Sequence, residues 1–212
     1  AEWNGLTPTD LVFPFFMFIM GVSMFFSLRK YDFKLTKASF WKLKKRAVLI
    51  FLVGFAINFL VTLLYNGWEG MKELRILGVL QRLALAYGFG SFIGLTINHK
   101  YLLHTAAGIL LCYAALLGFT GSTELSEGNL IAVIDRTLFG PTHMYHDYLP
   151  DGTRIAFDPE GLLSCLGSIG HVLIGFYAGK LIADNKQDKG LIVQRLFILG
   201  TIILFAGLLL SY

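Results

Sequence analysis

Charged residues are scarce in this sequence. Only 15% of its 212 residues are Asp, Glu, Lys or Arg, and 55% are apolar. Ordinary soluble domains carry about a quarter charged residues, and the mean hydropathy here is +0.64. This composition excludes an ordinary soluble domain and predicts a protein that crosses a membrane several times.

Cysteine is also rare, and several familiar signatures are missing. Cys112 and Cys165 lie in apolar stretches without ligand-like spacing, so we interpret them as small hydrophobic residues. The sequence contains no Walker, dinucleotide-binding or zinc signature and no serine nucleophile elbow, and we predict no metal site. Neither a signal peptide nor an initiator methionine precedes Ala1, and the last apolar run reaches Tyr212. We therefore expect a piece of a longer protein.

Six apolar runs are each close to the roughly 20 residues that a bilayer requires. They are continuous rather than alternating, which predicts helices and not the strands of a β-barrel. We predict an all-α fold, a polytopic bundle of about six transmembrane helices that forms one domain over residues 1–212. The runs cover residues 11–28, 47–65, 76–97, 101–120, 161–182 and 191–212.

The charges between these runs are distributed unequally. Residues 29–46 contain eight Lys or Arg and one Asp, and residues 98–100 and 180–195 on the same side add five more basic residues. The opposite side has four basic residues and eleven of the fourteen acidic ones. The positive-inside rule places the basic side in the cytoplasm. The net charge of +4 is thus explained by topology, and we predict no nucleic-acid partner. We expect a bacterial inner membrane, with Ala1 and residues 121–160 in the periplasm.

Two segments outside the membrane have recognisable character. Residues 121–160 are long enough to be functional, and they contain a pattern typical of a short amphipathic helix with Ile131, Ile134 and Leu138 on one face. Gly140-Pro141 and Pro150-Asp151-Gly152 are turn signals within the same segment. On the basic side, residues 31–46 combine aromatic residues with lysines, which is typical of a stretch lying against anionic headgroups.

Arg82 is a candidate functional residue because an arginine inside a membrane is expensive. It stands about seven residues, roughly 10 Å, into the third apolar run. One interpretation is a structural ion pair with an outer carboxylate. The other is a role in holding a polar substrate or an anionic transition state, with Gln81 beside it and Arg75 anchoring the mouth of the helix.

Histidines give weaker signals. His171 is expected near the middle of the bilayer among small residues that allow close approach. It is either a hydrogen-bonded buried residue or a ligand. His143 and His146 have nearly metal-like spacing, but no third ligand accompanies them, so we interpret them as surface loop residues.

Two short segments at predicted helix starts also have two interpretations. In Thr7-Pro8-Thr9-Asp10, Thr7 can cap the first helix and Asp10 can complete a capping-box-like pattern. The same carboxylate could instead orient a base or bind a substrate. Asp158-Pro159-Glu160 resembles an N-cap followed by an acidic first turn. It also places two carboxylates outside the membrane, near the mouths of the first and third helices.

Four motifs occur in a recognisable order. They are Trp3-Asn-Gly-Leu-Thr-x-x-Asp-Leu-Val-Phe-Pro-Phe-Phe, Arg75-Ile-x-Gly-Val-Leu-Gln-Arg, Gly128-Asn-Leu-x-Ala-x-Ile-Asp-Arg and Phe157-Asp-Pro-Glu-Gly-Leu-Leu-Ser. This set resembles the heparan-α-glucosaminide N-acetyltransferase family and its bacterial relatives. The resemblance implies a transmembrane acyltransferase that takes an acetyl group from cytosolic acetyl-CoA to an amino sugar or glycan on the outer face.

The resemblance also suggests site residues. The key histidine of the family stands immediately before the Ala-x-Trp-Asn-Gly segment, a position that precedes Ala1, so we expect the chain alone to be inactive. Asp10 matches an acidic motif position and is the catalytic candidate, as orienter or base, together with Asn4. Substrate-binding candidates at other motif positions are Arg82, Asn129, Asp135, Asp158 and Glu160, to which we add His171. The phosphates of CoA require cations on the inner side, and Lys42, Lys44, Lys45 and Arg46 lie there. The positive-inside rule already accounts for these basic residues, so they add little evidence for CoA binding.

A transporter or permease for a small polar solute is the alternative, with Arg82 and His171 lining its path, and a structural membrane subunit is a third hypothesis. The polar residues crowd the outer mouths of the helices, which favours a site reached from outside over a continuous pore. The lipid bilayer is the expected surrounding, and the sequence leaves a homo-oligomer open.

Overall fold

The computed structural model describes the backbone of residues 8–210 and the side chains of residues 11–209. The α-helices of this region are α1 (Pro8–Arg29), α2 (Lys37–Asn66), α3 (Val79–Thr96), α4 (Leu102–Phe119), α5 (Leu130–Phe139), α6 (Cys165–Asp184) and α7 (Lys189–Leu210). Single 3-10 turns follow α2, α3 and α5, namely η1 (Glu69–Glu73), η2 (His99–Tyr101) and η3 (Pro141–His143). The strands β1 (His146–Tyr148) and β2 (Arg154–Ala156) pair antiparallel, with Asp147 opposite Ile155.

Every predicted apolar run forms a helix, which confirms the all-α transmembrane bundle. Five helical segments are long and apolar enough to cross a membrane, and they correspond to α1, α2, α4, α6 and α7. The third run forms α3, whose 18 residues include Gln81 and Arg82 near its start and which is not among those five. The protein is thus an integral, multi-pass membrane protein.

Helix α2 begins ten residues before the predicted run. Thr36 and Ser39 form a capping box: Ser39 N donates to Thr36 Oγ1 at 3.1 Å, and Thr36 N donates to Ser39 Oγ at 2.9 Å. The resulting helix has 30 residues and is therefore about 45 Å long. That length matches the hydrocarbon core together with the headgroup regions. Most of the predicted interfacial stretch is thus the basic first part of α2.

The starts of α3 and α6 also differ from the expected positions. Helix α3 begins at Val79, so Arg82 lies in its first turn and not two turns inside. Helix α6 begins at Cys165, and Asp158 does not cap it. Instead Asp158 Oδ1 accepts a hydrogen bond from Glu160 N at 3.0 Å. This local turn precedes the helix, so α6 starts later than predicted.

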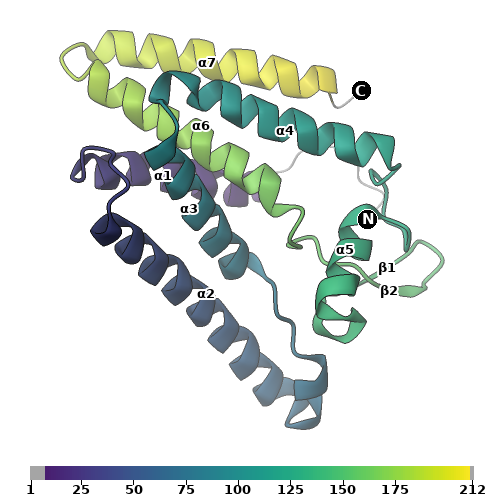
Figure 1. Ribbon diagram of the computed structural model, residues 1–212. Coiled ribbons are helices and arrows are strands. Elements are labelled where there is room, and N and C mark those ends of the chain that lie inside the picture. The colour runs from purple at the N-terminus through teal and green to yellow at the C-terminus, as the bar shows by residue number, and fades with distance from the viewer. Residues whose placement is uncertain (1–7, 211–212) are drawn as a thin grey trace.

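Helix α6 is the most buried of the five candidate spans, and α1, α3 and α4 pack around it (Figure 1). Contact with α1 is very close, because a Cβ atom at Gly21 would lie 2.1 Å from Val172 O and one at Gly175 would lie 2.1 Å from Phe18 O. Small residues of this kind let transmembrane helices approach backbone to backbone. Helix α2 packs mainly against α3 and lies along the lower edge of Figure 1.

The two ends of the bundle carry different structures. The short connections after α1, α3 and α6 lie at one end, on the left of Figure 1, whereas α5 and the β1–β2 hairpin lie together at the other. The buried side of α5 consists of Ile131, Ala132 and Asp135. Leu138, expected on the apolar face, is 59% exposed, because the helix turns its Asp135 side towards the segment before α6.

Candidate functional site

Charged side chains gather where the start of α3 meets the segment that precedes α6. We call this group the outer polar cluster. It comprises Arg75, Arg82, Asp135, Asp158 and Glu160. Four of these five residues come from the predicted site, and the fold brings them together from three separate stretches of sequence.

Arg75 binds both carboxylates of the 158–160 turn. Its Nε donates to Asp158 Oδ2 at 2.9 Å and its Nη2 donates to Asp158 Oδ1 at 2.6 Å, and Nη2 also pairs with Glu160. The ring of Tyr145 lies 5.1 Å from the guanidinium carbon, and Tyr145 N donates to Asp158 Oδ2 at 3.2 Å. Burial alone would lower the pKa of Arg75, but the two carboxylates raise it above its ordinary value. Asp158 is buried, so this pair fixes the turn to the start of α3.

Arg82 is held by neutral oxygens. Its Nε donates to Ser168 Oγ at 2.6 Å, and its Nη2 and Nη1 donate to the carbonyls of Ser164 at 3.2 Å and Pro159 at 3.4 Å. The ring of Phe13 lies 4.8 Å from its guanidinium carbon. No carboxylate among the described side chains forms an ion pair with Arg82. Among the described side chains, Asp158 and Glu160 pair with Arg75 and not with Arg82. The side chain of Asp10, a further outer carboxylate, lies outside the described residues.

Asp135 is fully buried beside this cluster. Its Oδ1 accepts a hydrogen bond from Leu162 N at 3.0 Å, while its Oδ2 has no hydrogen-bond partner among the described residues. Burial raises the pKa of this carboxyl to about 6, the Leu162 N–H opposes the rise, and the nearby charge of Asp158 adds to it. Gly161 makes the approach possible, since a Cβ there would lie 1.7 Å from Asp135 Oδ2.

Asn129 has its side-chain groups engaged within its own loop. It caps α5 by accepting a hydrogen bond from Ile131 N at 3.0 Å, and its amide donates to Ser122 O at 3.0 Å and Glu124 O at 2.9 Å. Because it is buried and bonded on both sides, Asn129 organises the connection between α4 and α5.

The two catalytic candidates lie at the edge of what the structure describes. Asn4 is outside the described residues, and Asp10 is described by its backbone alone. The described backbone begins at Pro8, within α1. Position 10 stands one turn before Phe13, which places this part of α1 at the same end of the bundle as Arg82.

The histidines lie apart from the outer polar cluster. His171 is exposed on α6, and its Nδ1 pairs with Gly167 O at 2.9 Å within the same helix. His143 Nδ1 pairs with Leu74 O at 2.9 Å and so ties η3 to the chain before α3. His146 is part of β1, and its pKa is lowered by burial and by the charge of Arg154.

Sequence reasoning missed some members of the arrangement. Arg75 was expected only to anchor a helix mouth, and Ser164, Ser168 and Tyr145 were not singled out. Only Ser168 acts through its hydroxyl, whereas Ser164 precedes α6 and accepts through its main-chain carbonyl, which any residue type would supply. Nothing in the sequence indicated that Tyr145 would reach Asp158.

The cluster offers two guanidinium groups with different chemistry. Arg75 is paired with two carboxylates, whereas Arg82 contacts serine and main-chain oxygens and pairs with no carboxylate among the described side chains. A cation held by neutral groups at a membrane boundary can stabilise an anion or a developing oxyanion, because little water screens it.

Comparison with known proteins gives a consistent picture. The chain matches no protein-family model. It is similar to heparan-alpha-glucosaminide N-acetyltransferase of Homo sapiens and of Mus musculus, with 29% identity to each over 248 aligned residues. The alignment covers 92% of this chain and 36% of each relative, so the chain spans about a third of the length of the curated relatives it matches. This homology confirms the resemblance predicted from the four motifs.

Proposed function

We propose, from the homology of this chain to heparan-α-glucosaminide N-acetyltransferase, that the protein is an integral membrane acyltransferase. In this proposal it moves an acetyl group from cytosolic acetyl-CoA to the amine of an amino sugar or glycan on the outer face. The outer polar cluster, at the end of the bundle opposite the basic loops, is the proposed acceptor site.

The set of neutral partners around Arg82 is the observation that carries the proposal. Its three hydrogen-bond acceptors are neutral oxygens, and no described carboxylate pairs with it. When an amine attacks an acyl carbonyl, negative charge develops on the carbonyl oxygen. A positioned cation or N–H donor that meets this charge lowers the barrier, and removal of one such donor typically slows catalysis about 100- to 1000-fold. Arg82 is the proposed donor.

The transfer itself is an exchange of two bonds at one carbon. The acceptor nitrogen bonds to the acetyl carbonyl carbon, and the bond from that carbon to the donor breaks, with the leaving atom of the donor keeping the electron pair. One amine proton passes to a base, which returns it to the leaving group. We propose Asp10 as that base or as the residue that orients it, with the histidine expected upstream of Ala1. Asn4 is proposed as a second donor to the carbonyl oxygen.

The remaining candidates have supporting roles in this proposal. Asp158 and Glu160 hold Arg75, which keeps these carboxylates from neutralising Arg82. Asp135 holds α5 to the segment before α6, and Asn129 orders the connection between α4 and α5. His171 is proposed to contact an acceptor only if the site extends along α6 towards the membrane centre.

A transferase assay tests the proposal. The full-length protein is reconstituted in vesicles with labelled acetyl-CoA and amino-sugar acceptors, glucosamine among them. We expect label on the acceptor amine, and we expect Arg82→Leu to reduce the rate at least 100-fold. Arg154→Leu is the matched control, because Arg154 is another outer arginine but is exposed and pairs only loosely with Glu73, at 3.9 Å.

The same preparation also tests the alternative function, a permease. A complete lack of acyl transfer to any amine or hydroxyl acceptor, together with saturable flux of a polar solute, would support a permease and reject the enzyme. Full activity of the Arg82→Leu variant would reject the proposed position of the site.

A further inference from the structure

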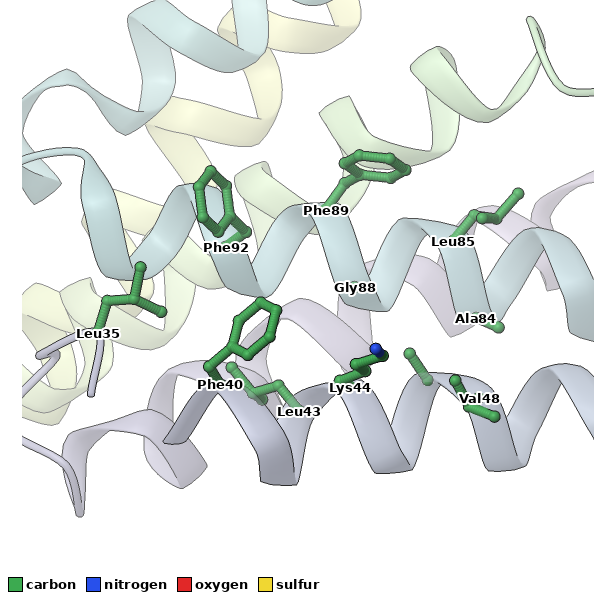
Figure 2. A pocket seen from close by; sticks show the side chains of 11 residues that line it. Leu35, Phe40, Leu43, Lys44, Val48, Ala84, Leu85, Gly88, Phe89 and Phe92 are labelled. Atoms are coloured by element: carbon green, nitrogen blue, oxygen red, sulfur yellow. The ribbon is translucent and has the colours of Figure 1, made fainter. Parts of the chain in front are cut away.

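A groove lies between α2 and α3 in the half of the bundle that carries the basic loops. Figure 2 shows its side chains, and its volume is about 390 Å³. Lys44 is the one charged residue in its lining, which is otherwise hydrocarbon or glycine. The central lining residues are Phe40, Leu43, Lys44, Gly88, Phe89 and Phe92.

The groove exists because small residues meet at its floor. A Cβ atom at Gly88 would have the Cβ of Ala47, 3.7 Å away, as its sole close neighbour. Ala84 is similarly small, while Phe89 and Phe92 flank the opening and are about half exposed. The result is a narrow apolar channel open to the side of the bundle, a shape that suits a methylene chain.

A second hollow adjoins the groove at the start of α2. Its volume is about 550 Å³, and its lining consists of Trp41, Lys42, Lys44, Lys45 and Val48. Lys44 and Val48 line both hollows. Within the described residues none of these lysines pairs with a carboxylate, and Lys44 Nζ lies 5.0 Å from the centre of the Trp41 ring. The apolar groove therefore adjoins a hollow whose lining includes three lysines, which we call the basin.

We propose that these two hollows form one binding site for an anionic phospholipid. The phosphate lies among Lys42, Lys44 and Lys45, and one acyl chain follows the groove past Gly88. Two features of the molecule select this occupant. The charge of the basin opposes that of the headgroup, and each lysine near an anionic lipid contributes favourably. The length of α2, about 45 Å, also exceeds the hydrocarbon core of about 30 Å, so its basic start extends towards the headgroups.

The phosphates of CoA share the chemistry of the basin. They do not account for the groove, which is lined by aromatic and aliphatic side chains over several turns of both helices. An acetyl group is far too short to fill it. The acyl chain of a lipid fills the groove while its headgroup fills the basin, so one molecule explains both hollows.

Native mass spectrometry of the purified protein tests this site with dioleoyl phosphatidylglycerol and dioleoyl phosphatidylcholine. These lipids have the same chains, and only the first carries a net charge. We expect phosphatidylglycerol to bind at least fivefold more tightly. Lys44→Ala should weaken its binding about fivefold, the equivalent of one lysine near an anionic lipid. Lys186→Ala, a change of an exposed lysine outside both hollows, should have no effect.

The groove is tested separately with Gly88→Leu, whose side chain occupies the channel. Binding of both lipids at this site should fall about tenfold, the loss expected when about two methylenes leave an apolar environment. Gly108→Leu on α4 is the control, since nothing lies within 4 Å of a Cβ there. Matching thermal midpoints among the variants would show that each of them folds.

Three results would overturn the proposal. Equal binding of the two lipids with no effect of Lys44→Ala would reject the cationic basin. A dimer without lipid that Gly88→Leu converts to monomer would show that a second copy covers the groove. Displacement of phosphatidylglycerol by CoA, with Gly88→Leu neutral, would assign the lysines to the acyl donor. The measurement requires no turnover, so it is independent of the transferase assay.

Discussion

Arg75 binds both carboxylate oxygens of Asp158 across a separation of 83 positions in the sequence, with Nε–Oδ2 and Nη2–Oδ1 distances of 2.9 and 2.6 Å. This contact joins the chain before α3 to the turn before α6. It also affects the neighbouring arginine, because Asp158 and Glu160 are bound to Arg75 and form no ion pair with Arg82.

Asp158→Asn should destabilise the protein substantially. The variant leaves Arg75 partly buried without its main counter-charge, and breaking a buried pair in this way costs about 3 kcal/mol. For a chain of this size we expect the thermal midpoint in detergent to fall by roughly 6–12 °C. Glu160→Gln is the matched control, because Glu160 is more exposed than Asp158 and its loss should have a smaller effect. Equal decreases in the thermal midpoint for the two variants would contradict the conclusion that Asp158 is the main counter-charge of Arg75.

Asp135 should make stability depend on pH in the acidic range. Its pKa is about 6, against an ordinary value of 3.8, so the folded state holds the proton more tightly than the unfolded state does. The contribution of Asp135 to stability is therefore full below about pH 4 and is lost as the pH rises through 6. A pKa shift of this size corresponds to about 3 kcal/mol in the free energy of unfolding.

Asp135→Asn removes this titration, so the two proteins are compared from roughly pH 4 to pH 7 by thermal unfolding. The midpoint of the wild type minus that of the variant should decrease as the pH rises, since only the wild type loses a favourable proton. A difference that stays constant across this range would show that Asp135 titrates with an ordinary pKa.

Ser168→Ala should reduce acetyl transfer by loosening Arg82. The hydroxyl accepts from Arg82 Nε at 2.6 Å, and a misplaced donor stabilises a developing oxyanion less well. We expect about a tenfold lower rate with a stability loss of about 2 kcal/mol. Ser91→Ala is the control, because the Ser91 hydroxyl is buried but has no hydrogen-bond partner among the described residues. Unchanged transfer by Ser168→Ala would remove Ser168 from the positioning of Arg82.

Gly161→Ala should disrupt the contact between α5 and the start of α6. The added Cβ would lie 1.7 Å from Asp135 Oδ2, so Asp135 or the turn must move, at a cost of about 1–3 kcal/mol. Gly128→Ala is the control, since nothing lies within 4 Å of a Cβ there. Combining Gly161→Ala with Asp135→Ala should recover part of the loss, and a strictly additive double variant would argue against a direct clash.

The sequence by itself indicated the long apolar helices, and it predicts which way they face. Long apolar runs must satisfy their backbone hydrogen bonds internally, and the excess of Lys and Arg on one side predicts the orientation. Both signals are local, so they can be read without the fold. The exact helix starts were predicted less well. The capping box of Thr36 and Ser39 starts α2 earlier than the apolar run predicts, and the turn at Asp158 makes α6 start later than predicted.

Only the tertiary structure decided which charges meet. The sequence left open whether Arg82 pairs with an outer carboxylate or holds a substrate. The β1–β2 hairpin brings Tyr145 and Asp158 beside Arg75, while α6 presents Ser168 to Arg82. Partner choice depends on distances between segments that are far apart in the chain, and helix packing fixes these distances. The composition of each segment alone does not contain that information.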